Sequence, residues 1–397
     1  MKLSRDVLSK SVISYAEVKV EAPEAPLPIP VTPIDNPIPY VQIWNSAVTP
    51  IDNTSPMNPA YVDFSYSRNM VYSPVLNKYY CIGSGSNSAL ICSSTDGKTW
   101  VIQKNLMDIT EYVRIHNIGY SPELNTFCAI AVERDYSAPR GILYSNDGEN
   151  WIFTPNEDLS NGDFLDICWN PQLKVFCAVG NRTNGRVLLS SNGKDWAYYL
   201  LPYDWEANPW GPDGPEWDFN SVCWGAELSL FCACSTDTMA ISKDGKMWSL
   251  HTVSLNNPDK PLVWRKVVYS PLLKKFCAIT ESQGYSATST DGINWTVFTN
   301  NGLEESEPYD AYVPSMVWSP KLGLFIASYN KYLNPGDTRY VYTSTDGETW
   351  TKTTCTFTPS LLSDEFFTIY VLHWNEYNNT LIGLGFINTM CTNPVTE

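Results

Sequence analysis

Short apolar segments separated by turn residues recur along the chain between residues 60 and 390. In each copy an aromatic residue precedes a tight turn, often Ser-Pro, and a second segment follows, which is strongly apolar at 127–130 and 276–279. This order predicts the end of one strand, a short turn and the start of the next strand. Seven copies are present, and their aromatic residues are Tyr72, Tyr120, Trp169, Trp224, Tyr269, Trp318 and Trp374.

A second motif follows six of these copies and ends in tryptophan. Residues 94–100 have the sequence STDGKTW, and related heptapeptides occupy 145–151, 190–196, 242–248, 289–295 and 344–350. The copy at 190–196 has Asn192 in place of the aspartate. The Asp-Gly pair predicts a hairpin turn with a positive φ at the glycine. The terminal tryptophans are 45 to 55 residues apart, a spacing typical of a four-stranded propeller blade.

The two motifs together predict an all-β protein, a seven-bladed β-propeller of four-stranded antiparallel blades, with six blades as the alternative. Seven inner hairpins but six outer ones are present, so one blade lacks its outer strand. A closed ring leaves few unpaired strand edges, which favours borrowing that strand from the other end of the chain. Within residues 40–45, the segment 40–44 (YVQIW) is mostly apolar, is β-prone and ends in Trp44. We expect them to pair with the C-terminal blade, formed by about residues 365–395, and to close a propeller spanning 40–397.

Residues 1–39 differ from the rest because seven prolines fall between positions 23 and 39. Such a composition predicts an extended, polyproline-like arm. We interpret this N-terminal arm as an anchor that orders on a partner.

The heptapeptide S-x-D-G-x-x-W resembles the Asp-box of sialidase-like propellers, shortened by one residue from S-x-D-x-G-x-T-W. Combined with the aromatic-Ser-Pro hairpins, it is also similar to repeats in bacteriophage tail and other virion proteins. The resemblance covers roughly residues 60–390. It implies a propeller fold in which the boxes are structural, and it implies a virion protein as the function.

The chain of 397 residues has 42 acidic and 26 basic side chains, a formal charge of −16. An acidic surface gains no counterion-release free energy on a phosphate backbone, which excludes nucleic acid and anionic membranes as expected partners. No long apolar run occurs, so we expect neither a signal peptide nor membrane insertion.

The 11 cysteines include five at one repeat position, Cys81, Cys128, Cys177, Cys232 and Cys277. Equivalent positions in different blades are too far apart for disulfides, so we expect free thiols and folding in a reducing cytoplasm. No Cys or His spacing indicates a metal site, and no cofactor is expected.

The candidate binding residues lie outside the repeat. Five tryptophans belong to neither motif, and three of these five lie in one loop between blades. We interpret this loop either as a lid over the blade ends or as a surface that binds carbohydrate or protein. Tyr309, Asp310, Arg114 and Arg265 are expected on the same face. The candidates in the loop are Tyr203, Trp205, Trp210, Asp213, Glu216 and Trp217.

The resemblance to sialidases implies three arginines that hold a carboxylate, with a Tyr-Glu nucleophile and an Asp acid/base. Arg68, Arg114 and Arg265 lie near the starts of first strands and could converge. The F/Y-R-I-P signature is absent, and no Tyr-Glu pair can be assigned, so we expect no enzyme activity.

The sequence therefore predicts a non-enzymatic virion structural or adhesion protein of a phage tail or capsid surface, assembled in the host cytoplasm. The arm would bind other virion structural proteins, and the propeller a host-surface glycan or protein. The alternatives are a sialidase-like glycoside hydrolase and an intracellular assembly-factor propeller.

Overall fold

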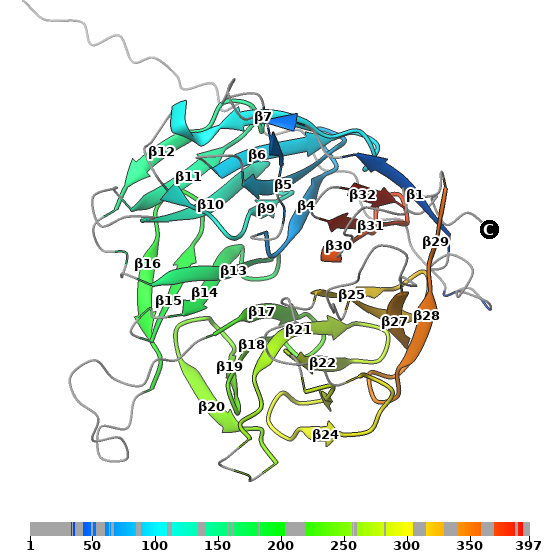
Figure 1. Ribbon diagram of the computed structural model, residues 1–397. Coiled ribbons are helices and arrows are strands. Elements are labelled where there is room, and N and C mark those ends of the chain that lie inside the picture. The colour runs from blue at the N-terminus through cyan, green and yellow to red at the C-terminus, as the bar shows by residue number, and fades with distance from the viewer. Residues whose placement is uncertain are drawn as a thin grey trace, which may run out of the picture.

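The computed structural model is a ring of β-sheets around a central axis (Figure 1). The prediction of an all-β propeller with four-stranded antiparallel blades is confirmed. The structure describes residues 33, 35, 43–48, 51–52, 60–62, 64, 67–84, 89–108, 113–133, 140–156, 159, 162–181, 183, 185–202, 219–255, 257, 260–281, 283–304, 315–328, 340–358, 369–385 and 388–391.

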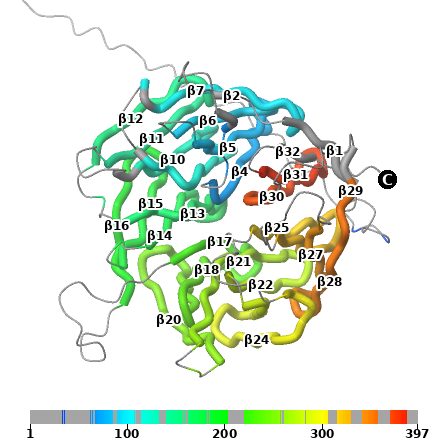
Figure 2. Tube along the Cα trace, viewed as in Figure 1, coloured from blue at the N-terminus to red at the C-terminus, as the bar shows by residue number. Residues whose placement is uncertain are grey.

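Six sheets are regular blades whose strands follow one another along the chain, with the first strand nearest the axis (Figure 2). In the second blade, β8 and β9 share the inner position, because both pair with β10. The strands of the first three blades are β4 (Met70–Ser73), β5 (Lys78–Ser84), β6 (Ala89–Ser94) and β7 (Val101–Asn105); β8 (Val113–Arg114), β9 (Gly119–Ser121), β10 (Thr126–Glu133), β11 (Gly141–Ser145) and β12 (Ile152–Pro155); β13 (Asp163–Asn170), β14 (Val175–Asn181), β15 (Arg186–Ser190) and β16 (Ala197–Leu200).

The next three blades repeat this order of strands. They comprise β17 (Ser221–Gly225), β18 (Leu230–Ser235), β19 (Thr238–Ser242) and β20 (Trp248–Thr252); β21 (Trp264–Ser270), β22 (Lys275–Thr280), β23 (Ser286–Ser289) and β24 (Thr296–Phe298); β25 (Ser315–Ser319), β26 (Leu324–Ser328), β27 (Tyr340–Ser344) and β28 (Thr351–Thr354). A 3-10 helix, η1 (Leu106–Asp108), follows β7, and β2 (Ile51–Asp52) pairs with β3 (Ala60–Tyr61).

A five-stranded sheet stands between the sixth and first blades and joins both ends of the chain (Figure 1). Its strand β1 pairs antiparallel with β32, with Asn45 opposite Cys391, and parallel with β29, with Ile43 opposite Thr356. We call it the closing sheet. Its order is β29 (Thr356–Thr358), β1 (Ile43–Val48), β32 (Asn388–Cys391), β31 (Thr380–Gly385) and β30 (Ile369–Asn375).

The seventh sheet is the closing sheet, which differs from the other blades in strand number and order, so the prediction of seven equivalent four-stranded blades is wrong. The six four-stranded blades of the alternative are present. The C-terminal repeat has no box, so no hairpin of its own supplies an outer strand. Two distant segments, β1 and β29, take that place instead. The N-terminal pairing begins at Ile43, and residues 40–42 lie outside the described residues.

Apolar clusters fill the spaces between neighbouring sheets. Tyr80 of the first blade packs on Phe127 of the second, with ring centroids 4.5 Å apart. The closing sheet is packed on both sides, because Trp374 joins a cluster with Leu322 of the sixth blade and Val371 joins one with residues of the first blade. Burial of these aromatic and aliphatic side chains is the main term that holds the blades together.

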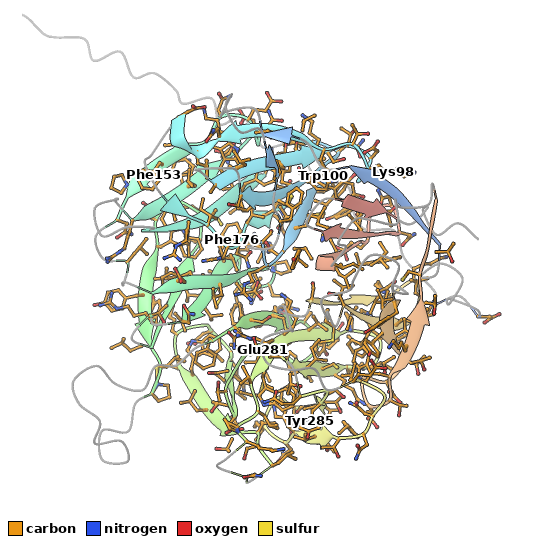
Figure 3. All side chains as sticks on the ribbon, in the orientation of Figure 1. Lys98, Trp100, Phe153, Phe176, Glu281 and Tyr285 are labelled. Carbon is orange, nitrogen blue, oxygen red and sulfur yellow. The ribbon has the colours of Figure 1, made fainter. Side chains whose placement is uncertain are left out.

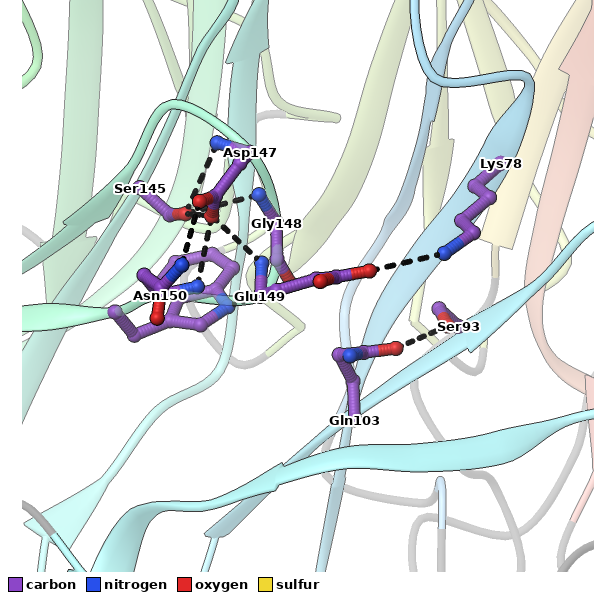
Figure 4. Close-up of polar contacts among 9 residues, drawn as sticks. Lys78, Ser93, Gln103, Ser145, Asp147, Gly148, Glu149 and Asn150 are labelled. Atoms are coloured by element: carbon purple, nitrogen blue, oxygen red, sulfur yellow. Dashed lines mark hydrogen bonds and ion pairs between the residues drawn. The ribbon is translucent and has the colours of Figure 1, made fainter.

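The box turns explain why the heptapeptide repeats (Figure 4). In the second blade, Ser145 Oγ accepts the backbone N–H of Gly148 at 2.9 Å, and Asp147 Oδ1 accepts those of Glu149 and Asn150 at 2.9 and 2.7 Å. Gly148 has a φ of 70°, and Trp151 Nε1 donates to its carbonyl at 3.0 Å. Burial alone would raise the pKa of Asp147, but these hydrogen bonds, with those from the Asn150 and Ser145 side chains, lower it to about 2.

Most of the predicted arm, residues 1–39, lies outside the described residues, which include Pro33 and Asp35. A Cβ placed on Gly323, in the turn between β25 and β26, would lie 3.2 Å from Cβ of Pro33. Pro33 therefore lies against the sixth blade of its own chain.

Candidate functional site

The inner strands carry a ring of polar side chains at the axis. These residues share one repeat position, three before the aromatic residue of the hairpin motif, and six of the seven are polar. We call the six the axial ring: Asn69, Asn117, Asp166, Ser221, Lys266 and Ser315.

Members of the axial ring bind the backbone of the following sheet. Asn69 Oδ1 accepts the N–H of Ile118 at 3.1 Å, and its Nδ2 donates to the carbonyl of the same residue at 2.8 Å. Ser315 Oγ accepts the N–H of Leu372 in the closing sheet at 2.9 Å. These bonds satisfy backbone groups where inner strands of adjacent sheets diverge, and they fix the sheets relative to one another.

Asp166 is the most heavily bonded residue of the axial ring. Its Oδ2 accepts Ser221 Oγ at 2.7 Å, the N–H of Val222 at 3.1 Å and Lys266 Nζ at 3.0 Å. Its Oδ1 accepts Asn117 Nδ2 at 2.8 Å and the N–H of Ile167 at 3.1 Å. The carboxylate is 5% exposed, so this is a buried charge whose desolvation is offset by a full set of donors.

Arg68 of the first blade and Arg265 of the fifth blade act on each other electrostatically. Burial, followed by repulsion from Arg265, lowers the pKa of Arg68 to about 10, while attraction from Glu281, Asp166 and Asp163 opposes the shift. Arg68 and Arg265 directly precede Asn69 and Lys266 of the axial ring along the chain. We call the interacting charges of Arg68, Arg265, Asp163, Asp166 and Glu281 the axial cluster.

Arg265 is held by two bonds that leave part of its guanidinium unused. Nη1 donates to Asn220 Oδ1 at 2.6 Å, and Nη2 donates to Glu281 Oε1 at 2.7 Å. Its Nε and Arg68 Nη1 are buried donors without a hydrogen-bond partner among the described residues. Figure 3 shows Glu281 nearer the centre of the ring than Phe153, which belongs to an outer strand.

A β-bulge sets the direction of Arg265. The register between β21 and β22 shifts between Trp264 and Lys266, so Arg265 is the extra residue. The same shift occurs in β13 between Phe164 and Asp166. Bulges re-aim side chains and are frequent beside functional sites. Arg265 thus takes part in the axial cluster, while the adjacent Lys266 belongs to the axial ring and binds Asp166.

The structure brings together two of the three arginines considered from the sequence. Arg114 lies in β8 with its side chain exposed, opposite Val132 of β10. In the second copy of the aromatic hairpin motif, His116 occupies the position that Arg68 has in the first copy. Nε2 of His116 lies 3.8 Å from Asp163 Oδ1. The convergence of Arg114 with the other two arginines stays a prediction.

Most of the other predicted binding residues are not placed. Tyr203, Trp205, Trp210, Asp213, Glu216 and Trp217, with Tyr309 and Asp310, lie outside the described residues. The axial ring was not predicted from the sequence, because its residues occupy a repeat position and the candidate binding residues were taken from outside the repeat.

Within the described ranges, no three His, Cys, Asp or Glu side chains are grouped so that they could hold a metal ion. The same part of the chain contains no helix that is long and apolar enough to cross a membrane.

No family model matches the sequence, and no curated protein matches it either. Solved structures do share the fold. Virginiamycin B lyase from Staphylococcus aureus matches with a TM-score of 0.57 and 7% identity over 87% of this chain and 99% of its own. The GH74 enzyme of Niastella koreensis matches with a TM-score of 0.58 and 12% identity over 83% of this chain and 53% of its own. Raptor of Chaetomium thermophilum matches with a TM-score of 0.51 and 10% identity over 83% of this chain and 28% of its own.

The expectation that the chain is not an enzyme is corrected by these comparisons. A lyase and a glycoside hydrolase are among the proteins with this fold, so catalysis is compatible with the architecture. Identities of 7% and 12% carry the fold alone, and the activity has to be argued from the residues of this chain.

Proposed function

We propose that this chain is a virion surface protein, of a phage tail or capsid, whose propeller binds an anionic group of a host-surface glycan or protein at the axial cluster. The virion assignment rests on the resemblance of the repeats to those of phage tail proteins. The binding role rests on the two arginines at the axis.

The binding role rests on two buried donors, Arg68 Nη1 and Arg265 Nε, that have no hydrogen-bond acceptor in the part of the chain that the structure describes. A buried donor without an acceptor costs free energy, and two guanidinium groups that repel each other add to that cost. A carboxylate or sulfate between them would accept both donors and reduce the repulsion. The neighbouring cations and anions are otherwise paired, Lys266 with Asp166 and Arg265 with Glu281.

Binding should be measured with paired probes that differ only in the acidic group, such as sialyllactose and lactose. We expect the acidic sugar to bind and the neutral one to bind at least tenfold more weakly. Arg68→Gln and Arg265→Gln should each weaken binding of the acidic sugar at least tenfold. Arg186→Gln is the matched control, because Arg186 stacks on Tyr198 at 4.7 Å in the outer strands and should leave the affinity unchanged.

The virion assignment has its own test. Particles assembled with the full chain and with a chain lacking residues 1–39 should differ, with the truncated chain absent from the particle. Incorporation of both chains to the same extent would contradict the proposed anchor.

A second candidate is a sialidase-like glycoside hydrolase. It is favoured by the carboxylates of Asp163, Asp166 and Glu281, all close enough to Arg68 to act on its pKa. A panel of fluorogenic sialosides and other glycosides decides between the two candidates. Turnover that Arg265→Ala abolishes would support hydrolysis, whereas binding without turnover would support the adhesion protein.

A further inference from the structure

Cysteines face each other across neighbouring strands in three blades. Cys168 of β13 is opposite Cys177 of β14, Cys223 of β17 is opposite Cys232 of β18, and a similar pair occurs between β5 and β6. None of the ten cysteines whose side chains the structure describes is in a disulfide. These pairs within one blade were not predicted from the sequence, because only equivalent positions in different blades were compared for disulfides.

The strand register brings Cys168 and Cys177 within bonding range. Directly opposite residues of an antiparallel pair have Cα atoms about 4.5 or 5.5 Å apart, and a disulfide needs about 4.4 to 6.8 Å. Because the two residues are directly opposite, their side chains lie on the same face of the sheet, and a hydrogen bond to Cys177, followed by burial, raises the pKa of Cys168 well above its usual value. Both residues pack in the same apolar cluster between the third and fourth blades.

Exposure distinguishes the pairs. Cys168 and Cys223 are partly exposed, while Cys177 and Cys232 are buried. The third pair, Cys81 and Cys92, is 0% exposed at both residues. Cys168 and Cys223 therefore keep some contact with solvent in the folded protein, whereas neither residue of the third pair does.

We propose that Cys168 and Cys177 form a modification site, at which a small disulfide such as oxidised glutathione converts the two thiols into a cross-strand disulfide. The Cys168 thiolate attacks the reagent, forms a mixed disulfide and expels one thiolate. Cys177 then loses its proton and attacks Cys168 Sγ, which forms the cross-strand bond and expels the second thiolate. The two cysteines lose two electrons and two protons, and the reagent leaves as two thiols.

The bond would cross-link the inner hairpin of the third blade. Asp166 lies two residues before Cys168 on β13, so the disulfide would restrain the strand that carries the axial carboxylate. A cross-link of this kind stabilises mainly by constraining the unfolded chain. The site does not depend on the proposed function, because it rests on strand register and exposure alone.

Peptide mapping of the full chain tests the proposal. The folded protein is treated with oxidised glutathione, quenched with acid, unfolded, alkylated and cleaved with trypsin. Lys174 lies between the two cysteines, so oxidation should link peptide 141–174 to peptide 175–182, with a mass two hydrogens below their sum. Cys81 and Cys92 share peptide 79–98 and should remain fully alkylated, which makes them an internal control.

Two variants assign the linkage. Cys177→Ser should stop the reaction at a glutathione adduct on Cys168, whereas Cys223→Ser should leave the linked peptides unchanged. Three results would overturn the proposal: full alkylation of Cys168 after oxidation, a persistent glutathione adduct on Cys168 in the unaltered chain, or linkage of Cys81 to Cys92 at an equal rate.

Discussion

Lys266 Nζ lies 3.0 Å from Asp166 Oδ2, although the two residues belong to the fifth and third blades. The fourth blade lies between them in sequence and also binds Asp166, through Ser221 Oγ at 2.7 Å. One carboxylate thus connects three successive blades at the axis. This arrangement gives the axial ring a structural role that is separate from any ligand, and it predicts where the propeller is most sensitive to substitution.

Replacing Asp166 should destabilise the propeller strongly. Asp166→Ala leaves the Lys266 ammonium, which is 17% exposed, without its counter-charge, and removal of one partner of a buried ion pair costs about 3 to 5 kcal/mol. Urea unfolding followed by tryptophan fluorescence measures the loss. Asp166→Ala/Lys266→Met should be more stable than Asp166→Ala alone, because the unpaired charge is gone.

The matched control for this prediction is an exposed ion pair. Asp108 lies 3.3 Å from Lys104 and is 61% exposed, so Asp108→Ala should change the free energy of unfolding by less than about 1 kcal/mol. Equal effects of Asp166→Ala and Asp108→Ala would mean that the axial carboxylate does not hold the blades together.

The aspartate of a box should tolerate asparagine better than alanine. In the box at 190–196, which has Asn192 at the aspartate position, the two bonds from the side chain to the turn backbone are present. Asn192 Oδ1 accepts the N–H groups of Lys194 and Asp195 at 2.9 and 2.8 Å. Asp147→Asn should keep these two turn bonds but lose the bond that Asn150 Nδ2 donates to Asp147 Oδ2 at 2.7 Å, so it should lower the melting temperature at pH 7 by about 2 °C. Asp147→Ala should lower it further, because two N–H groups lose their acceptor.

The same variants should differ in acid. The pKa of Asp147 is lowered to about 2 in the folded protein, from a usual value of about 4, so its carboxylate stabilises the fold above pH 4. That contribution is lost as the pH falls from about 4 to about 2. Because the side chain is exposed, the effect should remain below about 1 kcal/mol. In this window Asp147→Asn should lose less stability than the unaltered chain, and parallel pH profiles would contradict the assignment.

A methyl group on Gly148 should weaken the interface between the first and second blades. Gly148 has a φ of 70°, and a Cβ there would collide with the Tyr80 hydroxyl of the first blade. Gly148→Ala should cost about 1 to 3 kcal/mol in the free energy of unfolding. Gly148→Ala/Tyr80→Phe should recover little of this loss, because ring carbons Cζ and Cε1 of Tyr80 would still collide with the new Cβ, the latter at 2.7 Å, and the backbone strain remains.

Deletion of β1 from the closing sheet should lower the stability of the propeller strongly. Removing residues 40–48 deletes β1 and leaves β29 and β32 without their shared partner. The melting temperature should fall by more than 10 °C, whereas deletion of residues 1–30 should leave it unchanged. A melting temperature that the removal of β1 does not alter would show that the ring closes without it.

The fold could be predicted because its determinants are local and repeated. The Asp-Gly turn of each box depends on about seven consecutive residues, and six copies at regular spacing leave little choice of architecture. The closing sheet was harder to predict, because β1 pairs with strands more than 300 residues away. Its parallel pairing with β29 depends on tertiary context that no local pattern encodes.

The candidate site was predicted only in part. Arg68 and Arg265 were identified because they lie near the starts of first strands, but Arg114 was grouped with them from approximate position alone. Alignment on the aromatic residue places His116, not Arg114, at the position of Arg68. The same alignment would have revealed the axial ring, including Asp166. Its bonds to the next blade could not be derived, because they depend on the β-bulges and on the packing of adjacent blades.

A structure of the complex would show whether Arg68 and Arg265 bind an anionic group. Crystals of the full chain with sialyllactose should show the sugar carboxylate within about 3 Å of Arg68 Nη1 and Arg265 Nε. A bound sugar elsewhere on the propeller, with both nitrogens still unpartnered, would contradict the claim.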